Sequence, residues 1–171
     1  MTVSIVSSPP AVLGISKMSG LLTFTATIAF TATIARSSFR PGESIPTKLS
    51  LRNVLPATVW VNGRLGVGYE DGIEREVYFA VYATDGTLLP VPDNLRADVH
   101  RMPLQRTDFV TLSPDAAVDT IIDVGIWYRF QKSGRYRIIF TYENQRDGKE
   151  FGIDAFRGRI SADPVSIEIE P

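Results

Sequence analysis

The chain has 171 residues, a length that suits one domain with a small extension. Hydrophobic residues make up 44% and charged residues 22%, as in ordinary soluble globular proteins. Lysine plus arginine number 18 against 19 acidic residues, and this net charge of −1 gives no reason to expect nucleic acid as a partner. No cysteine is present, which excludes disulfides, thiolate nucleophiles and cysteine-ligated metals.

An uncharged stretch near the start, residues 21–35, has three interpretations. A membrane helix needs about 20 apolar residues; this stretch is shorter and rich in threonine, so we expect no integral membrane span. A signal peptide would use Lys17 as its basic flank and be cleaved near Ala35. We therefore expect a cytoplasmic protein, or a secreted one if residues 17–35 are a signal segment.

The third interpretation is β-structure, because the hexapeptide FTATIA occurs twice in tandem, at residues 24–29 and 30–35. Strand side chains alternate between faces, so a six-residue repeat keeps the same residues on the same face. Phenylalanine, alanine and isoleucine then lie on one face and threonine on the other. We expect a long strand that bends or switches sheets. It would pair within the fold or against another chain, which allows strand-mediated self-association.

The rest of the chain reads as short strands between turns. Turn signals recur at Asn62-Gly63, Asp71-Gly72, Asp85-Gly86, Asp147-Gly148 and Arg40-Pro41-Gly42-Glu43. Predicted strands cover residues 45–54, 58–65, 77–83, 87–91, 108–112, 117–124, 135–142 and 165–169. Only residues 93–101 suggest a short helical turn. The sequence therefore predicts an all-β domain over residues 21–171, preceded by an N-terminal extension at residues 1–20.

Several motifs go further than fold class. The run Ser133-Gly134-Arg135-Tyr136-Arg137-Ile138 precedes Tyr142, Pro41-Gly42-Glu43-Ser44 precedes an apolar strand, and Ala155-Phe156-Arg157-Gly158 precedes the last strand. Together they resemble bacterial immunoglobulin-like modules, in which a tyrosine after a glycine-containing turn ties its hydroxyl to nearby backbone. The resemblance implies an immunoglobulin-like antiparallel β-sandwich. Related sandwiches occur in the pro-region of some secreted peptidyl-Lys metallopeptidases and in a bacterial intracellular proteinase inhibitor.

Catalytic and metal-binding patterns are sparse. His100 is the only histidine, so a catalytic triad would have to use it, and no Gly-x-Ser-x-Gly motif presents a nucleophile. Zinc favours cysteine and histidine ligands, which this chain lacks in number. We expect no enzyme activity, no cofactor and no metal. A carboxylate-dependent hydrolase stays open as an alternative, although no acidic pair stands out among the 19 acids.

Two segments are candidates for binding. The glycine-rich loop NGRLGVGYEDG lacks the Lys-Ser/Thr ending of a phosphate-binding loop, so it reads as an inter-strand loop whose binding candidates are Arg64, Tyr69 and Glu70. A basic cluster interleaved with aromatic residues is either a small anionic-ligand patch or a solvated strand face. Its members are Tyr128, Arg129, Phe130, Lys132, Arg135 and Arg137.

The leading functional hypothesis is a non-catalytic binding or structural β-sandwich that contacts another protein through loops or a sheet edge. The second hypothesis, implied by the resemblance, is a proteinase inhibitor or a pro-region-like protein.

The inhibitor hypothesis predicts that an exposed loop enters a protease cleft. Titrating the purified protein into a panel of proteases should then abolish the activity of at least one of them. Full residual activity throughout the panel at micromolar protein would defeat this hypothesis.

Overall fold

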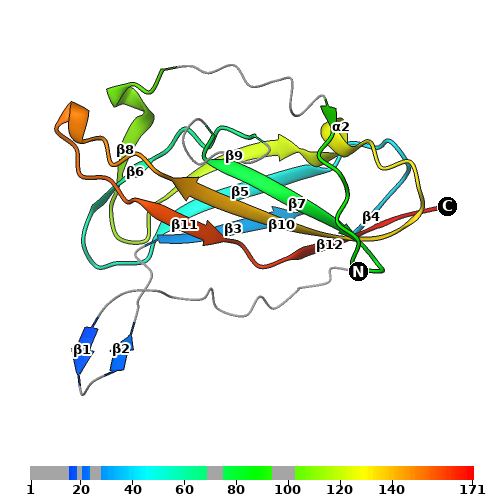
Figure 1. Ribbon diagram of the computed structural model, residues 1–171, viewed down its shortest axis with the longest axis horizontal. Coiled ribbons are helices and arrows are strands. Elements are labelled where there is room, and N and C mark those ends of the chain that lie inside the picture. Colours follow the sequence, from blue (N-terminus) through cyan, green and yellow to red (C-terminus); the bar gives the residue numbers. More distant parts are fainter. Residues whose placement is uncertain (1–15, 19–20, 24–27, 69–74, 94–102) are drawn as a thin grey trace.

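In a computed structural model the chain is built from β-strands, which confirms the predicted all-β class (Figure 1). The structure describes residues 16–18, 21–23, 28–68, 75–93 and 103–171. Its strands are β1 (Ser16–Met18), β2 (Leu21–Thr23), β3 (Ile28–Ile34), β4 (Ser38–Phe39), β5 (Pro46–Asn53), β6 (Val59–Asn62), β7 (Val77–Ala83), β8 (Phe109–Leu112), β9 (Ala117–Asp123), β10 (Gly134–Asn144), β11 (Gly158–Ser161) and β12 (Val165–Ile169). Its helices are α2 (Val124–Tyr128) and the 3₁₀ turns η1 (Arg106–Asp108) and η2 (Lys149–Phe151).

Two larger sheets enclose the core. One has the strand order β3-β5-β9, and the other has the order β11-β10-β12-β4 with β7 paired to β10. Strands β6 and β8 form a smaller pair, as do β1 and β2. The β1–β2 pair straddles residue 20, where the sequence analysis places the domain boundary. None of the helices among the described residues is both long and apolar enough to cross a membrane.

Each of the two larger sheets buries one face, because apolar side chains occupy every second position of its central strands. In β5 every second residue is buried, and in β10 Ile138, Phe140 and Tyr142 are fully buried. Side chains of the two sheets meet where the Phe30 ring lies 5.9 Å from the Tyr142 ring. Helix α2 contributes Trp127, whose ring lies 5.6 Å from that of Phe79. The core therefore joins both sheets and α2 into one apolar interior.

The tandem repeat is used inside the fold. Strand β3 contains its second copy up to Ile34, with Phe30 buried and Thr31 and Thr33 exposed, as predicted. Strand β3 pairs antiparallel with β5. The chain then switches sheets, because β4 pairs parallel with β12. The predicted sheet switch thus occurs after Ile34 instead of midway through the repeat; residues 24–27 lie outside the described part of the chain.

Strand prediction succeeded for β5, β7, β8, β9, β10 and β12, but it was wrong at residues 87–91 and missed β4, β11 and helix α2. Residues 87–91 make a single bridge, Tyr82↔Leu88, instead of a strand. Pro90 and Pro92 have no N–H to continue a ladder, which explains the failure. Strands β4 and β11 and helix α2 are short elements without a periodic signal. The predicted helical turn at 93–101 lies outside the described residues, apart from Asp93.

Two of the turn dipeptides behave differently from the tight hairpins that they suggest. Asn62 ends β6, whose partner is the distant β8, so Asn62-Gly63 does not connect paired strands. Gly148 has a φ of 74° and starts η2 within the long β10–β11 connection. By contrast, Gly86 (φ 82°) returns the chain tightly, with Ala83 N–H donating to the Thr87 carbonyl at 2.9 Å. The turn 71–72 lies outside the described residues.

A substitution in the repeat tests whether β3 is part of the core. Replacing Phe30, which is 2% exposed, by alanine should lower the free energy of unfolding by about 3–5 kcal/mol, because a cavity forms between the sheets. Thr31→Ala on the exposed face of the same strand is the matched control and should cost less than about 1 kcal/mol. Urea denaturation measures both. Equally small effects of the two substitutions would contradict the placement of β3 in the core. Cleavage near Ala35 would remove β3 from the mature protein, so the same test bears on the signal-peptide interpretation.

Candidate functional site

The loop predicted to bind a partner has a structural role in its described part. Arg64 lies against Glu76, whose side chain is only 2% exposed, while that of Arg64 is 17% exposed. Arg64 Nη2 donates to Glu76 Oε1 at 2.9 Å and Arg64 Nε donates to Oε2 at 3.3 Å. The Arg64 guanidinium therefore ties the start of the loop to Glu76. Tyr69 and Glu70, the other two predicted binding residues, lie outside the described residues.

Further hydrogen bonds converge on the same carboxylate. The Asn62 side-chain amide donates to Glu76 Oε1 at 3.1 Å, and the Gly66 N–H donates to Oε2 at 2.9 Å. A Cβ at Gly66 would lie 3.0 Å from Oε2, so glycine permits this close approach. The buried Tyr142 hydroxyl donates to the Asn62 carbonyl at 3.0 Å, and burial together with the charge of Glu76 raises the pKa of Tyr142. This cluster is a satisfied polar anchor between loop and core.

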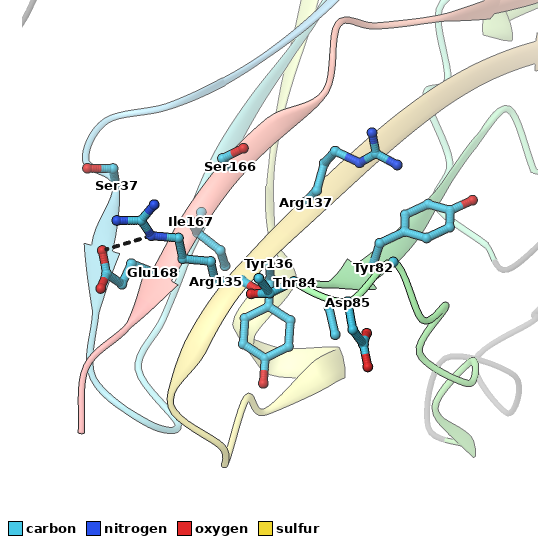
Figure 2. A pocket seen from close by; sticks show the side chains of 12 residues that line it. Ser37, Tyr82, Thr84, Asp85, Arg135, Tyr136, Arg137, Ser166, Ile167 and Glu168 are labelled. Carbon is cyan, nitrogen blue, oxygen red and sulfur yellow. Dashed lines mark hydrogen bonds and ion pairs between the residues drawn. The ribbon is translucent and has the colours of Figure 1, made fainter.

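A surface groove lies elsewhere, on the outward face of β7 and β10 (Figure 2). Because Phe79 and Phe140 point into the core, alternation sends Tyr82 and Arg137 to the opposite face. The register places these two residues directly opposite each other on neighbouring strands. The groove has a volume of about 690 Å³ and is lined by Ser37, Tyr82, Ala83, Thr84, Asp85, Gly86, Arg135, Tyr136, Arg137, Ser166, Ile167 and Glu168.

Arg137 is the distinctive side chain of the groove. Its guanidinium carbon lies 5.2 Å from the centre of the Tyr82 ring, within the range of a cation–π contact. Tyr82 is partly buried and Arg137 is exposed. Within the described part of the chain no carboxylate forms an ion pair with Arg137. The sheet thus presents a positive charge, held in place by an aromatic ring, to solvent.

The other charged groups of the groove are engaged. Arg135 Nε lies 3.7 Å from Glu168 Oε2. The Asp85 carboxylate accepts a hydrogen bond from the Thr87 N–H at 2.9 Å, and this bond lowers the pKa of Asp85. Asp85 is therefore ionised at neutral pH. Among the residues that the structure describes, Arg137 is the groove cation without an anionic partner.

A second arginine–tyrosine stack lies on the same face of the sheet. The Arg159 guanidinium carbon is 5.2 Å from the centre of the Tyr78 ring. The Tyr78 hydroxyl donates to Glu143 Oε2 at 3.0 Å, and Gln145 Nε2 donates to Glu143 Oε1 at 2.9 Å. Like Arg137, Arg159 has no ion-pair partner among the described residues. Two cations, each set on a ring, are thus available on one sheet face.

The structure divides the basic cluster that the sequence analysis singled out. Arg135 and Arg137 point outward into the groove, whereas Phe130 is buried and Tyr128 packs against Phe79 at a ring distance of 5.7 Å. Sequence reasoning missed Tyr82, because it lies 55 positions from Arg137 and only the strand register joins them. Alternation in 77–83 does indicate that Tyr78 and Tyr82 share a face. It does not indicate their partners.

In residues 28–68, 75–93 and 103–171 no three histidine, cysteine or acidic side chains gather as metal ligands would. His100 lies outside the described residues. Comparison with known proteins found no matching family model and no matching curated protein. The site is therefore interpreted from its own residues.

The role of Glu76 is testable by stability. Glu76→Ala should lower the free energy of unfolding by about 3 kcal/mol or more, because Arg64, Asn62 and Gly66 lose their common acceptor. Asp119→Ala is the matched control, since it breaks the exposed ion pair with Lys48 (2.8 Å) and should cost less than about 1 kcal/mol. Chemical denaturation compares the two variants. Similar costs would show that the Glu76 cluster is not the anchor described above.

Proposed function

We propose that this chain is a non-catalytic binding module with an immunoglobulin-like β-sandwich fold and that its partner is another protein. Three features support the fold: the β3-β5-β9 sheet faces the sheet around β10, the chain switches sheets between β3 and β4, and β4 runs parallel to β12. The Tyr136 hydroxyl donates to the Lys132 carbonyl at 2.9 Å, at the start of β10. This bond is similar to that of a tyrosine corner, which supports the proposal that β10 corresponds to strand F.

The groove of Tyr82 and Arg137 is the proposed binding site. Tyrosine and arginine are, with tryptophan, the residue types enriched at the hot spots of protein interfaces, where both combine large contact area with hydrogen-bonding groups. Here they are stacked on rigid neighbouring strands, so little side-chain entropy is lost on binding. The observation that carries the proposal is an exposed arginine that is positioned by a ring and has no anionic partner in the described part of the chain.

A catalytic function has less support in the same groove. A carboxylate-dependent hydrolase needs a general acid whose pKa is raised toward neutrality. The Thr87 N–H instead lowers the pKa of Asp85, and Glu168 faces Arg135 at 3.7 Å. These two acids are the carboxylates that line the groove. The surroundings of Asp85 favour its ionised form, which suits binding and does not suit proton donation.

Mapping the contact surface tests the proposal. We expect a pool of random heptapeptides, added to ¹⁵N-labelled protein, to shift the backbone amide resonances of Tyr82, Arg135 and Arg137 most strongly. Residues 63–68 serve as the internal comparison because they belong to the loop chosen from the sequence. Shifts concentrated in residues 63–68 would instead indicate that the loop is the binding site. No shift anywhere on the β7–β10 face would refute the proposed function.

A further inference from the structure

We infer that the β7–β10 face binds an extended acidic peptide segment with two carboxylates four residues apart and an apolar side chain midway between them. The inference rests on the proposed function, because it specifies the ligand of the same face. Its basis is the placement of the two arginine–tyrosine stacks, Arg137 on Tyr82 and Arg159 on Tyr78.

Spacing is the first argument. Tyr78 and Tyr82 are four residues apart on β7 and share its outward face, so their Cα atoms lie about 13 Å apart along the strand. An extended peptide also advances about 13 Å in four residues and returns side chains i and i+4 to one face. A single such segment lying on the sheet would bring one carboxylate to each guanidinium. Helical spacing would bring them only about 6 Å apart.

Between the two stacks the surface is apolar. Ile139 and Ala80 are register partners on β10 and β7, and alternation turns both outward. Both are partly exposed, and neither packs against the central core. An apolar side chain at position i+2 of the peptide would cover them and gain from the burial. The three positions together read acidic–x–apolar–x–acidic.

The charged groups already present on this face favour a partner with acidic groups over one with basic groups. The acids on this face already have donors: Glu168 faces Arg135, and Glu143 accepts from the Tyr78 hydroxyl. Arg137 and Arg159, in contrast, form no ion pair among the described residues, and each stacks on an aromatic ring. An incoming carboxylate therefore meets donors without displacing an existing partner.

The same acids argue against a nucleic acid. Glu143 lies directly across from Arg159 in the β10–β11 register, and Asp85 and Glu168 line the groove. Such interspersed negative charges repel a continuous polyanion but leave room for isolated carboxylates. The apolar centre at Ile139 likewise suits a side chain and does not suit a phosphodiester.

The test uses a fluorescein-labelled peptide, Thr-Glu-Thr-Val-Thr-Glu-Thr, and the full chain in a fluorescence-anisotropy titration. Saturable binding is expected, and Arg137→Gln or Arg159→Gln should each weaken it about tenfold, since each removes one charge-assisted hydrogen-bonded pair. Arg52→Gln is the matched control, an exposed arginine on the opposite sheet, and should leave affinity unchanged. Thermal unfolding of each variant verifies that the fold is intact.

Charge reversal makes the test specific. The double variant Arg137→Glu plus Arg159→Glu should no longer bind the acidic peptide. It should instead bind the peptide in which both glutamates are replaced by lysine. A peptide with its glutamates three residues apart, on opposite faces, should bind about tenfold more weakly than the original. Equal binding of the two spacings, or no effect of either arginine substitution, would overturn the inference.

Two further outcomes separate this inference from the proposed function. If the acidic peptide fails but other heptapeptides shift the Arg137 amide, the ligand class is wrong and the binding module stands. If twelve-nucleotide oligothymidylate binds as tightly as the peptide and also depends on Arg137 and Arg159, the face is a polyanion site and the inference is wrong.

Discussion

The antiparallel pairing of β7 with β10 is the constraint on which both the fold and the site depend. Their register runs from Tyr136↔Ala83 to Tyr142↔Val77 and sets which side chains point inward. A slip of one residue would turn Phe140 to solvent and drive Arg137 into the core. The cost of burying that unpaired charge is far larger than the cost of any contact on the surface. Core packing therefore selects the register, and the register assembles the exposed stack of Arg137 on Tyr82.

The polar cluster at Glu76 connects this pairing to the neighbouring loop. Glu76 directly precedes β7, and its carbonyl accepts a hydrogen bond from the Glu143 N–H of β10 at 2.7 Å. Its carboxylate meanwhile collects the donors of Asn62, Arg64 and Gly66. A buried carboxylate with every acceptor position used is stable only in one arrangement of its neighbours. We infer that the cluster specifies how the loop leaves β6, while the apolar core supplies most of the stability.

The alternation of apolar and polar residues explains which parts of the structure could be predicted from the sequence and which could not. Period-two patterns predicted β5, β7 and β12 with nearly their observed bounds. In β5 and β12 the pattern reflects one buried and one largely exposed face, whereas in β7 the outward side chains are buried or partly buried. The same patterns say nothing about which strands become neighbours. Tyr82 and Arg137 therefore stayed unconnected, and Arg137 was grouped with Tyr128 and Phe130, which pack inward.

The predictions of a tight turn at Asn62 and of a binding role for Arg64 were also made from local sequence alone. Asparagine before glycine is typical of a tight turn because its side chain bonds to local backbone, and Asn62 does accept from the Arg64 N–H at 3.2 Å. Its amide nitrogen, however, donates to Glu76, fourteen residues later, and this long-range bond determines where the chain goes. A local pattern cannot reveal a buried carboxylate elsewhere. The loop thus looked like a binding site by composition, although its described charged residue serves the fold.

The position of the proposed binding site on a sheet face limits how the site can change. Residues such as Arg137, Ile139 and Tyr82 alternate with core residues along the same two strands, so each can be exchanged without altering core volume. Their spacing, by contrast, is set by the strand rise and the register and cannot be changed without rebuilding the core. In the proposed site, the fold therefore allows the contacting side chains to change while it holds the distance between them constant.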